Sequence, residues 1–370
     1  MRTALGLGLL ALLALAPRPA APAAPRTPDE APLAIDAELG EVAWPGEAAL
    51  ATRIAEALER EIERRYPPED RPARRDVHAK AHGCARAELQ VDAALDPGLA
   101  AGVFTPGARY PAWVRFSNGS TKPDRPDARG DVRGVAIKLL DVPGEKLLST
   151  ERDARTQDFL LISHPVFFNA DPVKYARLIE RGASRNPLMK LAAPLALGWK
   201  GLGIVSAMSS LRIASPLEVR YWSTVPFQHG IGPGRRAAKY SVRPCEPGTS
   251  TIPDHPSPDY LHDALATTLR TANACFDFLL QVRTSDAMSV EDPRTEWPEA
   301  EAPFVKVARL VLPIQELAPA PFCEDLSFTP WHALPEHRPL GGVNRIRRVV
   351  YEAISTFRHD LNGVERTEPS

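Results

Sequence analysis

The sequence predicts an α+β protein built on an antiparallel eight-stranded β-barrel, with helices around the barrel and at its C-terminal end. Eight separate runs have strand-like composition, and several alternate apolar with polar residues, as a half-buried strand does. Helical patterns between them are too few for regular β-α-β alternation. Proline, at 38 of 370 residues, favours turns and long loops over a helical bundle. A closed barrel also leaves no exposed sheet edge.

The predicted strands follow one another along the chain, and turn residues bound most of them. They are residues 84–92, 110–118, 131–142, 156–168, 217–225, 237–245, 275–285 and 303–313. The alternation is clearest in the runs VRFSN, VRGVAIK and VKVARLVL. These three runs give the strongest support for strands with one apolar face.

Helical spacing of apolar residues, with charges between them, predicts four helices. They are residues 46–66, 171–183, about 257–274, and 343–360. Residues 184–216 are apolar and rich in small residues, and we interpret them as helical or irregular packing over the barrel.

The first 45 residues are assigned to export and a linker. The apolar run Ala4 to Ala16 is too short to span the roughly 30 Å hydrocarbon core comfortably, and it suits the hydrophobic region of a secretory signal. We therefore predict a signal peptide at 1–24, a linker at 25–45, one domain at 46–365, and a periplasmic or secreted protein. An uncleaved anchor is the alternative. No later segment is uninterruptedly apolar over the roughly 18 residues of a spanning helix, so no stable span is expected after processing.

The charge balance excludes a broad nucleic-acid footprint, because 45 basic residues face 46 acidic ones and no basic stripe is present. The four cysteines are widely spaced, with no CxxC pair and no CxxCH motif for covalent haem attachment. One or two disulfides fit an oxidising compartment, but spacing does not give the pairing.

A first chemical pair lies in the last predicted helix, where Arg347 and Tyr351 are four residues apart and share a face. A neighbouring cation favours the anionic form of a phenol. Tyrosinate is a hard oxygen donor, and tyrosine is an established axial ligand of haem iron. Taken alone, such a pair is more often a core aromatic beside a surface charge.

A second pair, Arg75 and His78, stands before the first predicted strand. A lone histidine is more often a structural hydrogen-bonding group than a catalyst. His78 and His82 have a spacing that would suit a metal on a helix, but no acidic residue lies between them and the context is strand-like. The pattern therefore does not favour a zinc site.

Five blocks change this assessment by their order: RDVHAKAHGCARAELQV, YPAWVRFSNGS, ARGDVRGVAIKLL, DFLLISHPVFFNADP and RIRRVVY. Together they resemble the catalase family, whose pattern runs R-x-x-H-A-K-G, V-R-F-S, D-x-R-G-x-A-x-K, T-P-x-F-F and R-x-x-x-Y. The resemblance covers most of residues 70–352 and is faint between 180 and 300. The closing segment FTPWHALPEHRPLGGVNRIRRVVYEAI resembles the shorter bacterial catalase-related branch.

The resemblance implies a haem b site and a role for each matching residue. The matched positions are His78 as distal acid–base group, Ser117 as a hydroxyl beside it, Tyr351 as proximal iron ligand, Arg347 as its cation, Arg75 and Arg115 as holders of the haem propionates, and Tyr175 where the family places a phenylalanine over the haem. The implied activity is that of a peroxidase or weak catalase, with a peroxide substrate and an electron donor that the sequence does not name.

The chain departs from the family pattern at the distal asparagine of G-N-N-T-P-x-F-F. The corresponding stretch here is LISHPVFF, in which Ile162 and Ser163 replace the asparagines and His164 replaces the threonine. Asn118 and His164 are the candidates to replace the lost amide, so Asn118 joins His78 and Ser117 as a candidate catalytic residue.

Two other classes of function are consistent with the sequence. One is an isomerase or lyase of organic (fatty-acid) hydroperoxides, and the other is a non-catalytic barrel that carries haem or a lipid. The oligomeric state is open too, a homo-oligomer included.

Overall fold

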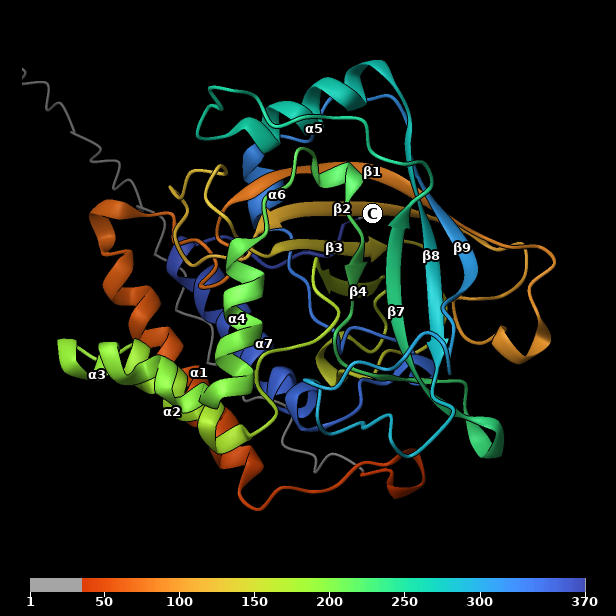
Figure 1. Cartoon of the computed structure of the whole chain (residues 1–370), viewed down its shortest axis with the longest axis horizontal. Helices are drawn as coiled ribbons and strands as arrows, with labels where there is room; N and C mark the ends of the chain where they lie inside the picture. Colours follow the sequence, from red (N-terminus) through yellow and green to blue (C-terminus); the bar gives the residue numbers. More distant parts are fainter. Residues whose placement is uncertain (1–34, 370) are drawn as a thin grey trace, which may run out of the picture.

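The computed structural model describes residues 35–369 of the chain, so the predicted signal peptide lies outside the described residues and stays a prediction. Nine strands form one antiparallel sheet in the order β5-β4-β3-β2-β1-β9-β8-β7-β6, and a further pairing of β5 with β7 closes it into a barrel (Figure 1). Eight strands therefore make the ring, and β6 pairs beside β7. The predicted barrel is confirmed.

The strand bounds follow the predicted runs. They are β1 (Ala81–Val91), β2 (Arg109–Asn118), β3 (Arg133–Leu139), β4 (Gln157–Ile162), β5 (Tyr221–Trp222), β6 (Phe227–His229), β7 (Arg236–Pro244), β8 (Ala274–Val282) and β9 (Val305–Leu312). Each of the eight predicted strands overlaps one strand of the ring. β6 was not predicted, since three residues are too few to show alternation.

The barrel interior is a packed core. Val114, Ile137 and Phe278 have no exposed surface, and the ring centroids of Phe159 and Phe278 are 5.0 Å apart. Burial of side chains of this size stabilises the fold by about 1.5–3 kcal/mol each. Because successive side chains of a strand point to opposite faces, the neighbour Arg115 points out of the barrel. A ligand site is therefore expected on the outer face.

Seven helices surround the barrel in the described residues. They are α1 (Glu47–Arg65), α2 (Pro172–Gly182), α3 (Pro187–Ala192), α4 (Gly198–Ser210), α5 (Tyr260–Thr271), α6 (Ala320–Asp325) and α7 (Gly342–Asn362). The four predicted helices correspond to α1, α2, α5 and α7. α1, α2 and α7 pack together through a cluster that includes Leu50, Ile54, Ala176 and Ile346.

The packed body begins before residue 46. Residues Ala37–Leu39 form a short 3₁₀ helix, and Glu41 is buried. The Glu41 carboxylate lies 2.8 Å from both Arg338 and Arg345. Part of the stretch assigned to a linker is thus held by buried charge pairs.

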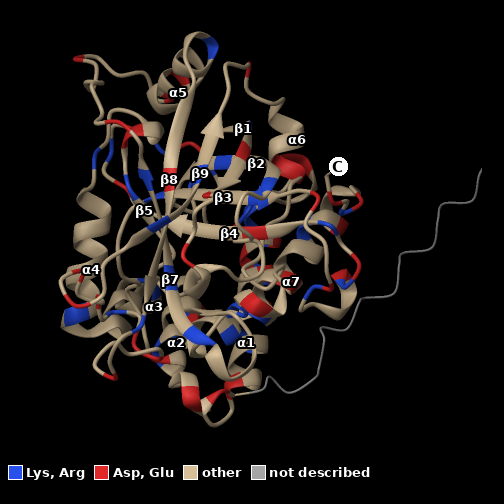
Figure 2. Ribbon diagram, turned by 90° about the vertical axis from the view of Figure 1, so that its right-hand side faces the viewer, with Lys and Arg blue, Asp and Glu red and all other residues tan. Residues whose placement is uncertain are grey.

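Two disulfides join distant parts of the chain: Cys84 to Cys323, and Cys245 to Cys275. The first ties α6 to β1, and the second ties the end of β7 to the start of β8. Figure 2 shows acidic and basic positions interspersed around the barrel.

The stretch Pro187–Ser210 has the length and composition of a membrane span, with a mean hydropathy of 1.4 and 28% of its apolar window buried. It is not one straight helix, because Gly198 (φ +64°) separates the 3₁₀ turn after α3 from α4. α4 has 13 residues, fewer than the about 20 that cross a bilayer.

Candidate functional site

A cavity of about 310 Å³ lies between the outer face of the barrel and helices α2 and α7. The volume falls within the range of small-molecule and cofactor sites. Seven of the eight predicted site residues line it: Arg75, His78, Arg115, Ser117, Tyr175, Arg347 and Tyr351. Positions separated by up to 276 residues of sequence thus meet in one place.

Two residues of β2 bind His78, and a glycine of β3 leaves room for its ring. One of its ring nitrogens, Nδ1, lies 3.0 Å from Ser117 Oγ, and its backbone carbonyl accepts a 2.9 Å hydrogen bond from Arg115. Its φ of +57° is uncommon for a non-glycine residue and is typical of functional sites. Gly134 of β3 leaves room for the ring, because a Cβ there would lie 2.5 Å from Nδ1.

The environment of His78 keeps its imidazole neutral. Burial, and next the positive charge of Arg115, lower the pKa of His78 from 6.5 to about 4. Arg347 and Arg75 act in the same direction. At neutral pH the ring can therefore accept a proton rather than donate one.

Three guanidinium groups converge at one edge of the cavity. Arg75, Arg115 and Arg358 lie 2.9, 3.8 and 3.8 Å from the Glu324 carboxylate of α6. Burial, and next the charge of Arg75, lower the pKa of Arg115 to about 9 and that of Arg358 to about 10.

The three guanidinium groups share the single carboxylate of Glu324, so this edge of the cavity keeps an excess of positive charge. Within the described residues, the buried Nε of Arg115 has no hydrogen-bond partner. The cluster suits a ligand that carries two carboxylates. Sequence reasoning missed Arg358, although it lies two helical turns after Tyr351 on α7.

Tyr351 and Arg347 face the cavity from α7, as their spacing predicts. Arg347 donates to Asn344 Oδ1 at 3.4 Å, and its guanidinium lies 5.2 Å from the ring centroid of Phe167. A second phenol, Tyr175 of α2, also lines the cavity, where burial raises its pKa to about 12. The charge of Arg347 acts to lower the pKa of Tyr175, but burial outweighs it. Tyr351 lies one helical turn after Arg347 on α7.

The structure does not bring Asn118 to the cavity. Its amide donates to Asp127 at 2.8 Å and accepts from Arg133, and its side chain is fully buried. Asn118 follows Ser117 on β2, so strand alternation turns it to the other face.

The substituted stretch offers no amide in its place. Ile162 lines the cavity, whereas Ser163 Oγ accepts a 2.8 Å hydrogen bond from the backbone of Arg133. His164 does not line the cavity, and its Nδ1 lies 3.0 Å from the Val166 carbonyl oxygen. Among the described residues that line the cavity there is no asparagine or glutamine.

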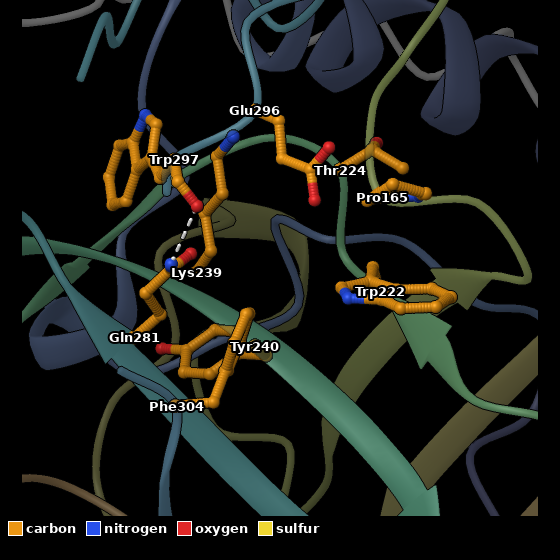
Figure 3. Close-up of a pocket in the computed structure, with 9 residues that line it drawn as sticks. All are labelled: Pro165, Trp222, Thr224, Lys239, Tyr240, Gln281, Glu296, Trp297 and Phe304. Carbon is orange, nitrogen blue, oxygen red and sulfur yellow. Dashed lines mark hydrogen bonds between the residues drawn. The ribbon is translucent and has the colours of Figure 1, made fainter. Parts of the chain in front are cut away.

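A second cavity, near Lys239, has a volume of only about 10 Å³, room for one water molecule (Figure 3). The Lys239 ammonium lies 4.7 Å from the ring centroid of Trp297, and Gln281 donates to the Trp297 carbonyl at 2.9 Å. Burial lowers the pKa of Lys239 to about 8. The space is too small for an organic substrate.

Glu151, His332 and Glu368 also approach one another, with one ligand atom of each lying within 4.8 Å of the others. Their carboxylates are already paired with cations: Glu368 lies 2.9 Å from Lys138, and Glu151 contacts Arg366. This set is therefore a charge network and not a metal centre.

Comparison with known proteins finds similarity to catalases. Residues 59–200 match the family model for catalase. A catalase-related peroxidase of Mycolicibacterium paratuberculosis is 28% identical over 280 residues, which cover 72% of this chain and 83% of that protein.

Solved structures of catalases share the fold. A fungal catalase aligns with a TM-score of 0.60 and 21% identity, covering 78% of this chain and 60% of that one. Catalase A from Saccharomyces cerevisiae aligns with a TM-score of 0.60 and 20% identity, covering 78% and 62%. A bacterial catalase aligns with a TM-score of 0.59 and 18% identity, covering 93% and 67%. The chain thus spans 60% and 62% of the length of the two fungal proteins.

Proposed function

Because this chain is a catalase-family protein, we propose that it is a haem-dependent oxidoreductase that acts on peroxides. One observation carries the proposal. A single cavity combines a phenol beside a guanidinium, a neutral histidine, and three guanidiniums that share one carboxylate.

The residues fit a haem b. The surplus of positive charge at Arg75, Arg115 and Arg358 matches the two propionates of that group. Tyr351 would ligate the iron, and Arg347 lies one helical turn before it on α7. The sequence contains no CxxCH motif, which fits a haem held without covalent attachment.

When bound, ferric haem supplies the redox chemistry of O–O cleavage. His78 takes a proton from one peroxide oxygen and returns it to the other, which makes water or an alcohol the leaving group. Ser117, 3.0 Å from Nδ1, holds the imidazole ring, and Arg115 holds its backbone. Positioned acid–base groups typically contribute about 10²–10⁴-fold in rate.

We expect a peroxidase rather than an efficient catalase. Dismutation requires a second hydrogen peroxide molecule to be oriented, and the family uses an amide that both donates and accepts hydrogen bonds. Ile162 can do neither. The turnover then needs two electrons from an organic donor. Together with two protons, they reduce an organic hydroperoxide to an alcohol and water, or hydrogen peroxide to two water molecules.

The apolar lining of the cavity also favours a second candidate activity, the rearrangement of organic hydroperoxides. Leu160, Leu161, Ile162, Phe168 and Met208 line the cavity and suit the chain of an organic hydroperoxide. Rearrangement of such a substrate to an isomeric product would need no external donor.

We also infer that the protein works outside the cytoplasm. The apolar run near the N-terminus and the two disulfides support this location, because disulfides persist in oxidising compartments.

The visible spectrum of the purified protein tests the proposal first. A Soret band with one haem per chain is expected, and a protein that does not take up haem would contradict it. Peroxide consumption with and without an organic donor then separates peroxidase, isomerase and non-catalytic carrier.

A further inference from the structure

The four most exposed large hydrophobic side chains of the described protein fall within one short stretch, residues 188–199. Leu188, Leu191, Leu195 and Trp199 are exposed by 72, 79, 71 and 92%, more than any other large apolar residue there. Met189, between them, is exposed by 43%. We call these five residues the α3–α4 surface. Isolated exposed apolar residues are normal, but a contiguous group is typical of an interaction site.

The surface stands at the periphery of the molecule. Figure 1 shows α3 at the lower left edge, next to α2 and away from the barrel strands. The bend at Gly198 sets α4 at an angle to α3, so that residues of both helices and of the turn between them contribute.

Basic residues flank this apolar group along the chain. Residues 172–212 contain seven Lys or Arg and one Glu, in a chain whose net charge is −1. Six of the seven cations are exposed: Lys174, Arg177, Arg185, Lys190, Lys200 and Arg212. The one Glu of the segment, Glu180, is bound by Arg53 of α1 at 2.7 Å.

Two other carboxylates reach the segment but leave most of its cations uncompensated. Asp171 lies 3.5 Å from Lys174, and Asp292 lies 4.0 Å from Lys200. Arg185 and Lys190 remain exposed beside the apolar residues.

We propose that the α3–α4 surface docks the protein onto an anionic lipid bilayer. The apolar side chains enter the interfacial region, Trp199 lies at the level of the headgroups, and the surrounding cations bind anionic lipid. α2 and α4 also line the cavity, through Tyr175 and Met208. Docking therefore brings the bilayer to helices that enclose the cavity. This proposal does not depend on haem.

A bilayer fits this surface better than a second copy or another protein does. In a two-fold dimer the surface meets itself, so its excess of positive charge repels. The core of a protein interface is depleted in lysine, whereas here Lys190 and Lys200 alternate with the apolar residues.

Vesicle co-sedimentation of the full chain tests the proposal. The probe is phosphatidylcholine vesicles with and without phosphatidylglycerol. The double variant Leu195→Ser, Trp199→Ser is compared with Ile231→Ser, Ile314→Ser, which removes exposed apolar residues (61 and 56%) elsewhere. All variants keep the same N-terminal apolar run, so differences between them report on the surface.

We expect the first double variant to lose at least about tenfold in affinity for the anionic vesicles, and the matched variant to bind like wild type. Reversing Arg185 and Lys190 to Glu should cost about tenfold or more and abolish the preference for phosphatidylglycerol. Brominated lipid should quench a fluorescence component that Trp199→Phe removes.

Three outcomes overturn the proposal. Brominated lipid that leaves Trp199 unquenched places this residue outside the bilayer. Equal binding of the Leu195, Trp199 variant and wild type removes the surface from binding. If the wild-type protein forms a dimer without lipid, and the Leu195→Ser, Trp199→Ser variant does not, the surface binds a second copy of the chain.

Discussion

The Arg115 guanidinium donates a 2.9 Å hydrogen bond to the backbone carbonyl of His78. One residue therefore connects the cationic edge of the cavity to the imidazole that faces its interior. The same guanidinium lies 3.8 Å from Glu324, on α6, which the Cys84–Cys323 disulfide ties to β1. The group that would seat a carboxylate and the group that would move a proton are thus held by one network.

His78→Ala should keep haem binding and lose the fast reaction with peroxide. The imidazole is the neutral base in the cavity, so the rate constant of the peroxide reaction should fall by about 10²–10⁴-fold. Stopped-flow absorbance after addition of peroxide measures it. His164→Ala is the matched control, because His164 does not line the cavity. A rate unchanged in His78→Ala would remove this residue from the mechanism.

Gly134→Ala should reproduce much of that defect without changing a chemical group. The added Cβ would lie 2.5 Å from His78 Nδ1 and 2.9 Å from Ser117 Oγ, so the ring must move. We expect normal haem content and a peroxide reaction slowed by at least about tenfold. Gly203→Ala on α4, where no atom lies within 4 Å of the new Cβ, serves as control. Wild-type kinetics in Gly134→Ala would show that the position of this ring is not critical.

The peroxide reaction should be insensitive to pH where histidine ordinarily titrates. Burial and Arg115 hold the pKa of His78 at about 4. The neutral base is thus present throughout the range from pH 8 to about 5, and activity is lost only as pH falls through the folded pKa. Rates measured over this range, with the haem spectrum checked at each pH, should stay level. An inflection near the ordinary value of about 6.5 would contradict the assigned environment.

Ile162→Asn should shift the balance from peroxidation toward dismutation. Ile162 lines the cavity at the position where the family pattern has an amide. Oxygen evolution from hydrogen peroxide, divided by donor oxidation on the same preparation, should rise by about tenfold or more. Ile162→Val controls for loss of bulk. Efficient oxygen evolution by the wild-type protein would instead mean that another group orients the second peroxide.

Alternation predicted the ring of eight strands, and helical periodicity predicted α1, α2, α5 and α7, because most of the predicted runs repeat their pattern several times. β5 has only two residues, but it lies inside the longer predicted run 217–225. β6, with three residues, and α6, with six, are too short to show a period. The same alternation separates Ser117 from Asn118, so the placement of Asn118 on the other face could have been predicted from the strand alone.

The cationic edge was harder to predict. The resemblance identified Arg75 and Arg115. Arg358 and Glu324 join them only through tertiary packing. A disulfide brings α6, which carries Glu324, to β1, and the spacing of the cysteines does not reveal that pairing. The exposure of the α3–α4 surface could not be predicted from the sequence either, because an apolar stretch is as consistent with burial in the core as with contact with lipid.

The central claim is that the cavity binds haem through Tyr351, and haem titration of the Tyr351→Phe variant tests it most directly. A phenyl ring has no donor atom, so the account predicts that the variant loses the Soret band and axial-ligand signature of the wild type or binds haem far more weakly. Tyr175→Phe removes the other phenol of the cavity and should keep both. A Tyr351→Phe protein with the wild-type haem content and spectrum would contradict the account.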